Sequence, residues 1–302
     1  MLSRLAESFY WIGRYLERAE ATARLLAEHY HLTVEDRSVP DDVAAAVVLD
    51  ALSLPHDIVI SPTELVRALL GDVANPSTVI GSVGAARENA RSVRDALSGD
   101  VFEALNGAHL TLTRGLTAAA SPGASMYRVL ERLMVVNGAI EWTMPRDEGH
   151  FFLSLGRSLE RIDMTTRLLD VRHDLVWPDT GPVATLRSAA GLSAFLRTGE
   201  APTGEQVREF LVLDPTFPRS MLHSARAAES AVRGLQTLGG VDDLELVREV
   251  GLMRSRLEFA GGVHDPAVID QLCHDTQVSG VSAASAVADA YFRQAGTIVW
   301  SH

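Results

Sequence analysis

The strongest constraint on the fold is a segment that the sequence contains twice, 143 residues apart. When residues 9–26 are aligned with residues 152–169, ten of the eighteen positions are identical, whereas average amino-acid usage gives roughly one identity by chance. Both segments contain the pattern Gly-Arg-x-Leu-Glu-Arg, at residues 13–18 and 156–161. A duplication of one structural unit is the simplest cause.

The repeat continues beyond this segment. Residues 72–82 align with residues 214–224 at a shift of 142, with Asp-x-x-x-Pro at the start of both blocks. A weaker similarity, the shared pattern Gly-x-Ile-x-Trp, pairs residues 138–142 with residues 296–300 at a shift of 158. The larger last shift predicts an insertion of about 16 residues in the second copy.

These alignments predict the domain organisation. We expect a first helical copy at residues 1–143 and a second at residues 147–302, with the insertion near residues 261–280. The joint between the copies is only a few residues long and contains Pro145, which leaves little freedom for independent motion. We therefore expect the two copies to pack as one compact, pseudo-symmetric unit.

Helical signals recur along the chain. Residues 3–31 have the periodicity of an amphipathic helix, with an apolar stripe on one side. That stripe consists of Phe9, Ile12, Tyr15, Leu16, Ala19, Ala23 and Leu26. Ser61-Pro62-Thr63-Glu64 combines an N-cap, a proline in the first turn and a glutamate three residues after the cap, and predicts a helix over residues 62–70.

Proline and glycine positions mark further helix ends. Asn75-Pro76 and Phe217-Pro218 indicate two helix starts, and Gly99 and Gly239-Gly240 indicate two helix ends. No segment shows the alternating pattern of a strand. The prediction is an all-α helical bundle of about ten to twelve helices without a β-sheet. Irregular structure is expected at residues 34–42, 51–61, 143–149, 198–204 and 261–280.

The charge balance and the cysteine content restrict partners and compartment. The net charge of −12 repels phosphate backbones, so nucleic acid is not an expected partner. The single cysteine, Cys273, excludes an intrachain disulfide, which is typical of a reducing compartment. No apolar run reaches the roughly 20 residues that cross a membrane. We therefore expect a cytoplasmic protein without a membrane partner.

Charged residues lie opposite the apolar stripe on the first repeated segment. They are spaced three or four positions apart and so share one face of the predicted helix. The second segment keeps this face, with Asp163 where the first has Glu20. The candidate substrate- or partner-binding residues on the two copies of the face are Arg14, Glu17, Arg18, Arg24, Arg157, Glu160, Arg161, Asp163 and Arg167.

This charged face has more than one interpretation. Most charged helix faces are simply solvated. Here both copies keep the same residue types while a surface position beside them differs, Glu28 against Val171. The face can instead be buried between the copies as Arg–Glu pairs that fix their register, or it can line a cleft that the copies share. The sequence leaves these alternatives open.

A second basic group follows the helix start at Asn75-Pro76. Arg87, Arg91 and Arg94 are spaced i, i+4 and i+7, and three guanidiniums on one helix face can bind phosphate or carboxylate groups. Neighbouring acids can equally neutralise them as structural pairs. Only Arg91 recurs in the second copy, as Arg233, so a binding role for this group would be asymmetric.

Familiar catalytic templates are missing from the sequence. It has no Gly-x-x-x-x-Gly-Lys phosphate loop and no dinucleotide fingerprint. A di-iron bundle needs two Glu-x-x-His motifs, and the chain has one, Glu28-x-x-His31. His264-Asp265 and His274-Asp275 could form His–carboxylate dyads, but no motif places a Ser or Cys nucleophile beside them. We expect no metal site and no cofactor of the chain's own.

Five blocks that occur in order resemble the Alpha-E family, which is named for its helices and its ER motif. They are residues 2–26, 75–77, 86–91, 156–165 and 213–220, so the resemblance extends over nearly the whole chain. It implies a bacterial cytoplasmic protein whose relatives are encoded beside, or fused to, circularly permuted ATP-grasp ligases and transglutaminase-like proteins. ATP-grasp enzymes form amide bonds through acyl phosphates, so the resemblance implies a system for amide or peptide ligation.

Three hypotheses follow for the repeated Arg/Glu face. In the first, the chain is a partner or substrate-presenting subunit of an ATP-grasp ligase and handles a peptide or amino acid, with ATP and Mg entering only through the ligase. In the second, it is itself an amide-handling transferase or hydrolase, with Glu17 or Glu160 as general base. In the third, the Arg and Glu side chains are buried structural pairs. The sequence does not establish whether the chain is an enzyme.

Overall fold

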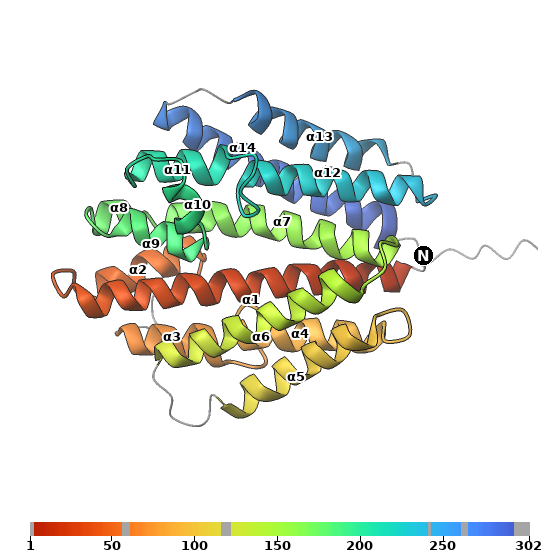
Figure 1. The fold of residues 1–302 in the computed structure, drawn as a ribbon, viewed down its shortest axis with the longest axis horizontal. Helices are drawn as coiled ribbons and strands as arrows, with labels where there is room; N and C mark the ends of the chain where they lie inside the picture. The colour runs from red at the N-terminus through yellow and green to blue at the C-terminus, as the bar shows by residue number, and fades with distance from the viewer. Residues whose placement is uncertain (1–2, 56–60, 116–121, 241–242, 261–264, 293–302) are drawn as a thin grey trace, which may run out of the picture.

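A computed structural model describes residues 3–55, 61–115, 122–240, 243–260 and 265–292, and over these ranges the chain is helical and contains no strand (Figure 1). This confirms the all-α prediction. In chain order the helices are α1 (Ser3–Glu35), α2 (Asp41–Ala51), α3 (Pro62–Gly71), α4 (Val79–Ser92), α5 (Gly99–Gly115), α6 (Pro122–Thr143), α7 (Glu148–Asp170), α8 (His173–Val176), α9 (Gly181–Ser188), α10 (Leu192–Leu196), α11 (Gly204–Leu213), α12 (Met221–Thr237), α13 (Leu244–Phe259), α14 (Pro266–Val287) and the π-helical turn η2 (Ala288–Phe292).

The two long helices α1 and α7 form the centre of the molecule and run side by side in the same direction (Figure 1). Helices α3 to α6 lie on the α1 side of this pair, and α11 to α14 lie on the α7 side. Six of the seven residues of the apolar stripe of α1 are buried as predicted, from Phe9 at 1% exposure to Leu26 at 0%, whereas Tyr15 is only partly buried. Because α1 has neighbours on several sides, its opposite face is also largely covered.

The glycine of the repeated motif allows α1 and α7 to approach closely. A Cβ atom on Gly13 would lie 2.1 Å from the carbonyl oxygen of Leu153, and one on Gly156 would lie 2.1 Å from that of Tyr10. Both distances are far below any contact that a side chain can make, so only glycine fits at either position. A shift of 143 in the residue numbers converts the first of these contacts into the second. Where α1 and α7 cross, their contacts therefore follow the sequence repeat.

Side-chain caps set several helix starts. The Ser61 hydroxyl accepts a hydrogen bond from the Glu64 amide, and Pro62 begins α3, as predicted. The starts indicated by Asn75-Pro76 and Phe217-Pro218 occur three residues after each proline. There Thr78 caps α4 and Ser220 caps α12. Each of these hydroxyls also donates to the carbonyl of an aspartate six residues earlier, Asp72 or Asp214, so the two aligned loops have the same fold.

Two sequence predictions of irregular structure or helix ends are wrong. Gly99 begins α5 instead of ending a helix, because α4 already ends at Ser92 and the Ser98 hydroxyl accepts from the Val101 amide. Most of the range 261–280, predicted to be irregular, belongs to α14. Asp265 caps that helix and Pro266 occupies its first turn, the same signature that begins α3.

The predicted division of the chain falls in the loop between α6 and α7, where Asp147 caps α7. The insertion in the second copy and the symmetry of the whole halves stay predictions. The predicted insertion depends on the second Gly-x-Ile-x-Trp pattern, at residues 296–300, and these residues lie outside the described ranges. Within the described ranges, no helix has both the length and the apolar character required to cross a membrane.

Candidate functional site

The two repeated Glu-Arg pairs meet across the α1–α7 crossing. Arg18 Nε donates to Glu160 Oε1 at 2.6 Å, and Arg161 Nη2 donates to Glu17 Oε2 at 2.6 Å. The two contacts are equivalent in the repeat, because Arg18 aligns with Arg161 and Glu17 aligns with Glu160 at a shift of 143. Glu17 is 3% exposed and Glu160 is 0% exposed, so both carboxylates are removed from water. Buried charges persist only when they are paired and hydrogen-bonded, and each glutamate has an arginine partner on the other helix.

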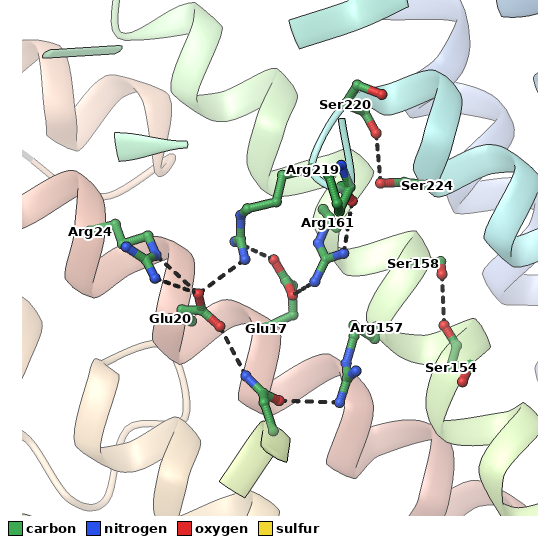
Figure 2. A network of polar contacts seen from close by, with 12 residues as sticks. Glu17, Glu20, Arg24, Ser154, Arg157, Ser158, Arg161, Arg219, Ser220 and Ser224 are labelled. Atoms are coloured by element: carbon green, nitrogen blue, oxygen red, sulfur yellow. Dashed lines mark hydrogen bonds and ion pairs between the residues drawn. The ribbon is translucent and has the colours of Figure 1, made fainter. Parts of the chain in front are cut away.

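The side of the crossing that holds Glu17 is closed by a residue from the loop before α12. Arg219 donates through Nη2 to Glu17 Oε1 at 2.5 Å and through Nη1 to Glu20 Oε1 at 3.1 Å. Figure 2 shows Glu17 between Arg161 and Arg219. Arg161 also donates to the carbonyl oxygen of Pro218 at 3.0 Å, which anchors the loop that carries Arg219.

The network on this side extends to α6. Asn137 donates to Glu20 Oε2 at 3.1 Å and accepts from Arg157 Nη2 at 3.2 Å. Arg24 donates to Glu20 Oε1 at 3.0 Å from the next turn of α1. These contacts join α1, α6, α7 and the loop before α12 into one closed polar cluster (Figure 2).

The charge state of Glu17 follows from this closure. Burial raises the pKa of its carboxyl group, but the charges of Arg161 and Arg219 outweigh burial and lower the pKa to about 2. Burial lowers the pKa of Arg157, and the neighbouring Arg161 acts in the same direction. Glu17 is therefore an ionised, fully occupied carboxylate. A carboxylate of that kind is a poor general base, because it is not poised to take a proton near neutral pH.

The side that holds Glu160 has a different set of partners. Arg14 Nε donates to Glu160 Oε2 at 2.5 Å, and Arg18 occupies the other oxygen. Both carboxylate oxygens are thus engaged, which also argues against Glu160 as a general base. One turn further along α7, Asp163 accepts from Arg167 at 2.8 Å and from Gln277 of α14 at 3.1 Å.

Among the described residues, no arginine from a loop covers Glu160 in the way that Arg219 covers Glu17. In the alignment at a shift of 142, the position of Arg219 corresponds to Ser77, which is exposed in the loop before α4. A groove of about 640 Å³ opens on this side, between α1, α7, α14 and η2. Its walls include Trp11, Arg14, Arg18, Asp163, Val281 and Ala284. The two sides of the crossing carry similar residues. The side that holds Glu17 is closed by Arg219, and the side that holds Glu160 opens into the groove.

Aromatic rings position the arginines at the groove. Trp11 and Tyr15 stack with ring centroids 5.3 Å apart. The guanidinium carbon of Arg14 lies 5.6 Å from the Trp11 ring centroid, and that of Arg18 lies 5.6 Å from the Tyr15 ring centroid. These are cation–π distances. The side chains of Arg14 and Arg18 remain 17% and 25% exposed, respectively, so both can reach a molecule in the groove.

The structure separates the sequence candidates into three groups. Arg14, Arg18, Asp163 and Arg167 line the groove, with Glu160 bonded behind the two arginines. Glu17, Arg24, Arg157 and Arg161 belong to the closed cluster. The third group, Arg87, Arg91 and Arg94, has contacts of its own around α4 and α5.

Arg87, Arg91 and Arg94 do not all lie on one helix as their spacing suggested. Arg87 and Arg91 both pair with Glu88. Arg94 lies beyond the end of α4 at Ser92, and its guanidinium sits 4.9 Å from the centroid of Phe102. Because α4 ends at Ser92, the helical spacing does not extend to Arg94. Arg87 and Arg91 are thus engaged in local pairs, and a binding role for the three arginines stays a prediction.

Sequence reasoning missed Arg219 and Asn137 as members of the cluster. Neither lies on the repeated segment, and each reaches the cluster from a separate element. A signal for Arg219 was present, because its aligned loops have an arginine in one copy and a serine in the other. Nothing in the sequence around Asn137 indicates its role. Across the described residues, no three His, Cys, Asp or Glu side chains come together as a possible metal site.

Comparisons with known proteins identify a family with an ER motif. Residues 1–292 match the model of Alpha-E, described as a predicted alpha-helical domain with a conserved ER motif. Curated relatives from Mycobacterium bovis and from two strains of Mycobacterium tuberculosis, each described as uncharacterized, are 24% identical over 315 residues, covering 86% of this chain and 35% of the relative. The chain therefore spans about a third of the length of these relatives. No solved structure matches it significantly.

Proposed function

The chain belongs to the Alpha-E family, and from that premise we propose that it is a substrate-presenting subunit of an amide- or peptide-bond-forming system. It acts with a circularly permuted ATP-grasp ligase in the bacterial cytoplasm. The substrate is a peptide or amino acid held in the groove between α1, α7 and α14. ATP and Mg are bound by the ligase, and a transglutaminase-like protein is a possible further partner.

The observation that carries this proposal is the position of Arg14 and Arg18. Both bind Glu160 through Nε, and both face a groove large enough for a small ligand. Glu160 holds the two guanidiniums in place, because its oxygens each bind one of them. A rigid pair of arginines beside aromatic side chains suits a ligand with both anionic and apolar parts.

The closed cluster has a different role in the proposal. Glu17 and its arginines are occupied by one another, so they hold α1 and α7 in register and thereby shape the groove on the opposite side. Of the two copies of the Arg/Glu face, the one around Glu17 thus has a structural role, and the one around Glu160 binds the substrate. The length of the mycobacterial relatives supports joint action with other domains, since most of each relative lies outside the matched region.

The test is a reconstituted reaction with an ATP-grasp protein of the class associated with the family. We expect this chain to co-elute with that protein and to increase ADP release in the presence of a peptide or amino-acid substrate. The variant Ala284→Phe fills the groove without touching an ion pair, and should reduce ADP release while leaving co-elution intact.

The matched control is Ala267→Phe, an exposed position in the first turn of the same helix. This variant should behave as the unaltered chain. Co-elution without any change in ADP release, or equal ADP release from both variants, would refute the substrate-presenting role. Turnover of an amide substrate by the isolated chain would instead establish the stand-alone enzyme that the sequence also allowed.

A further inference from the structure

The groove contains a guanidinium with its two terminal nitrogens available. Arg18 uses Nε for Glu160, and among the described residues its two Nη atoms have no hydrogen-bond partner. Arg14 uses Nε for Glu160 and Nη1 for the Tyr10 hydroxyl at 3.1 Å, which leaves Nη2. The two Nη atoms of one arginine form a fork that matches the two oxygens of a carboxylate.

The partner of Arg18 prevents this fork from turning away. Glu160 is completely buried and binds Arg18 at 2.6 Å, and the Tyr15 ring lies against the guanidinium face. Arginine loses less conformational freedom on binding when its plane is already fixed. The site is therefore organised before a ligand arrives.

The charges around the groove favour a ligand with a single negative charge. Arg14, Arg18 and Arg167 face it, while Glu7 and Asp163 contribute two carboxylates and Glu160 lies behind. Among the residues that the structure describes, the three positive and three negative groups balance. A monoanion disturbs this balance less than a dianion such as phosphate, and the acidic net charge of the chain adds to that preference.

One wall of the groove is apolar. Trp11, Val281, Ala284 and Phe292 line it beside the arginines, and Val281 is 64% exposed. Several apolar side chains that line one groove in contact with water mark a place where another apolar group can bind. The ligand that matches both features has a carboxylate next to an apolar side chain.

We infer that the groove recognises the free carboxylate of a peptide or amino acid whose adjacent side chain is apolar. The carboxylate binds the Nη fork of Arg18 with support from Arg14, and the side chain packs against Trp11, Val281 and Ala284. This inference rests on the proposed function, because it names the class of substrate that the subunit presents.

The isolated chain tests this inference by calorimetry, with N-acetyl-L-phenylalanine as the probe. The comparison ligand is N-acetyl-L-phenylalanine amide, which keeps the side chain but lacks the charge. We expect the amide to bind at least about tenfold more weakly, the loss typical of one charge-assisted contact. Inorganic phosphate should not displace the acid. Tryptophan fluorescence should change on binding, and Trp11→Phe should remove that change.

Variants separate recognition from folding. Arg18→Gln removes the fork, and Ala284→Phe blocks the groove and leaves the Arg18–Glu160 pair intact, so both should abolish the difference between acid and amide. Arg233→Gln is the control, because that side chain is 70% exposed on α12 and pairs with Glu229 on its own helix. It should bind as the unaltered chain, and circular dichroism should verify that every variant is folded.

Equal binding of acid and amide would overturn the carboxylate assignment. Displacement by phosphate would overturn the preference for an apolar monoanion, and absence of binding by the acid would overturn the site. Binding by the acid without an effect on the ATP-grasp reaction would refute the proposed function and leave this inference standing. Stimulation of that reaction without any binding of the probe would do the reverse.

Discussion

The guanidinium of Arg219 donates to the carboxylate of Glu17 at 2.5 Å, and this contact closes one side of the α1–α7 crossing. The residue aligned with Arg219 at a shift of 142, Ser77, is exposed in the loop before α4. On the opposite side of the crossing, Arg14 and Arg18 line a groove. The predictions below test the parts of this arrangement.

Arg219→Ser should weaken the closed cluster, because it removes charge-assisted hydrogen bonds to Glu17 and Glu20. The expected loss is roughly 1–3 kcal/mol in the free energy of unfolding, measured with urea. Ser77→Ala, at the aligned position, should change it by less than about 0.5 kcal/mol. Equal effects of the two substitutions would show that the closure is not a source of stability.

Glu17→Ala should destabilise the chain more strongly than Arg219→Ser. It leaves Arg161 and Arg219, only 18% and 14% exposed, without their shared carboxylate. Removing one partner of a buried ion pair costs about 3–5 kcal/mol. Glu88→Ala, which breaks pairs of a carboxylate that is 53% exposed, should cost less than about 1 kcal/mol. A small loss for Glu17→Ala in urea unfolding would mean that the cluster is solvated.

Gly13→Ala should force α1 and α7 apart, because its Cβ would lie 2.1 Å from the Leu153 carbonyl oxygen. Overpacking of this kind costs about 1–3 kcal/mol, and more when backbone must move. Gly138→Ala is the control on α6, where a Cβ meets nothing within 4 Å. It should stabilise the chain by roughly 0.5–1 kcal/mol through helix propensity. A thermal unfolding series on the two variants should therefore give shifts of opposite sign.

Acidification should first destabilise the chain through a buried histidine pair near the end of α1. His29 Nδ1 and His173 Nε2 lie 3.3 Å apart beside Trp177. Burial lowers the pKa of His29 to about 3, with a contribution from His173, and burial lowers the pKa of His173 to about 4. Both rings are therefore neutral in the folded chain at pH values where they are protonated after unfolding.

The sign of this pH dependence follows from the lowered pKa values. The stability that the pair contributes is complete above pH 6.5, the ordinary histidine pKa, and is lost as the pH falls towards the folded values of about 4 and about 3. Between pH 6.5 and 5, each ring should account for up to about 2 kcal/mol. Urea unfolding at several pH values measures the slope.

The double variant His29→Leu/His173→Leu should flatten the decline below pH 6.5 by removing both buried rings. The control is His274→Leu, because His274 is exposed on α14. It should leave the slope unchanged. If the double variant retains the original slope, the decline has another origin. The Glu17 carboxyl group adds a further loss only at lower pH, between its ordinary pKa of 4.5 and about 2.

The sequence by itself determined the helices and the repeat. Apolar periodicity predicted α1, and Ser61-Pro62 predicted α3, because these signals act over neighbouring turns of one helix. The same local chemistry at Asp265-Pro266 was sufficient to predict α14, although the expectation of an insertion there obscured it. The ten identities between the two segments also indicated that Glu17 and Glu160 share one role.

Only the tertiary structure decided what that role is on each side. Arg18 and Glu160 are 142 positions apart, and Glu17 and Arg219 are 202 positions apart. No periodicity within a helix relates residues so distant, so the pairing depends on how closely α1 and α7 cross and on where the loop before α12 lies. Desolvation and ion pairing are properties of that packing. They make Glu17 part of a closed cluster and leave Arg14 and Arg18 at the wall of an open groove.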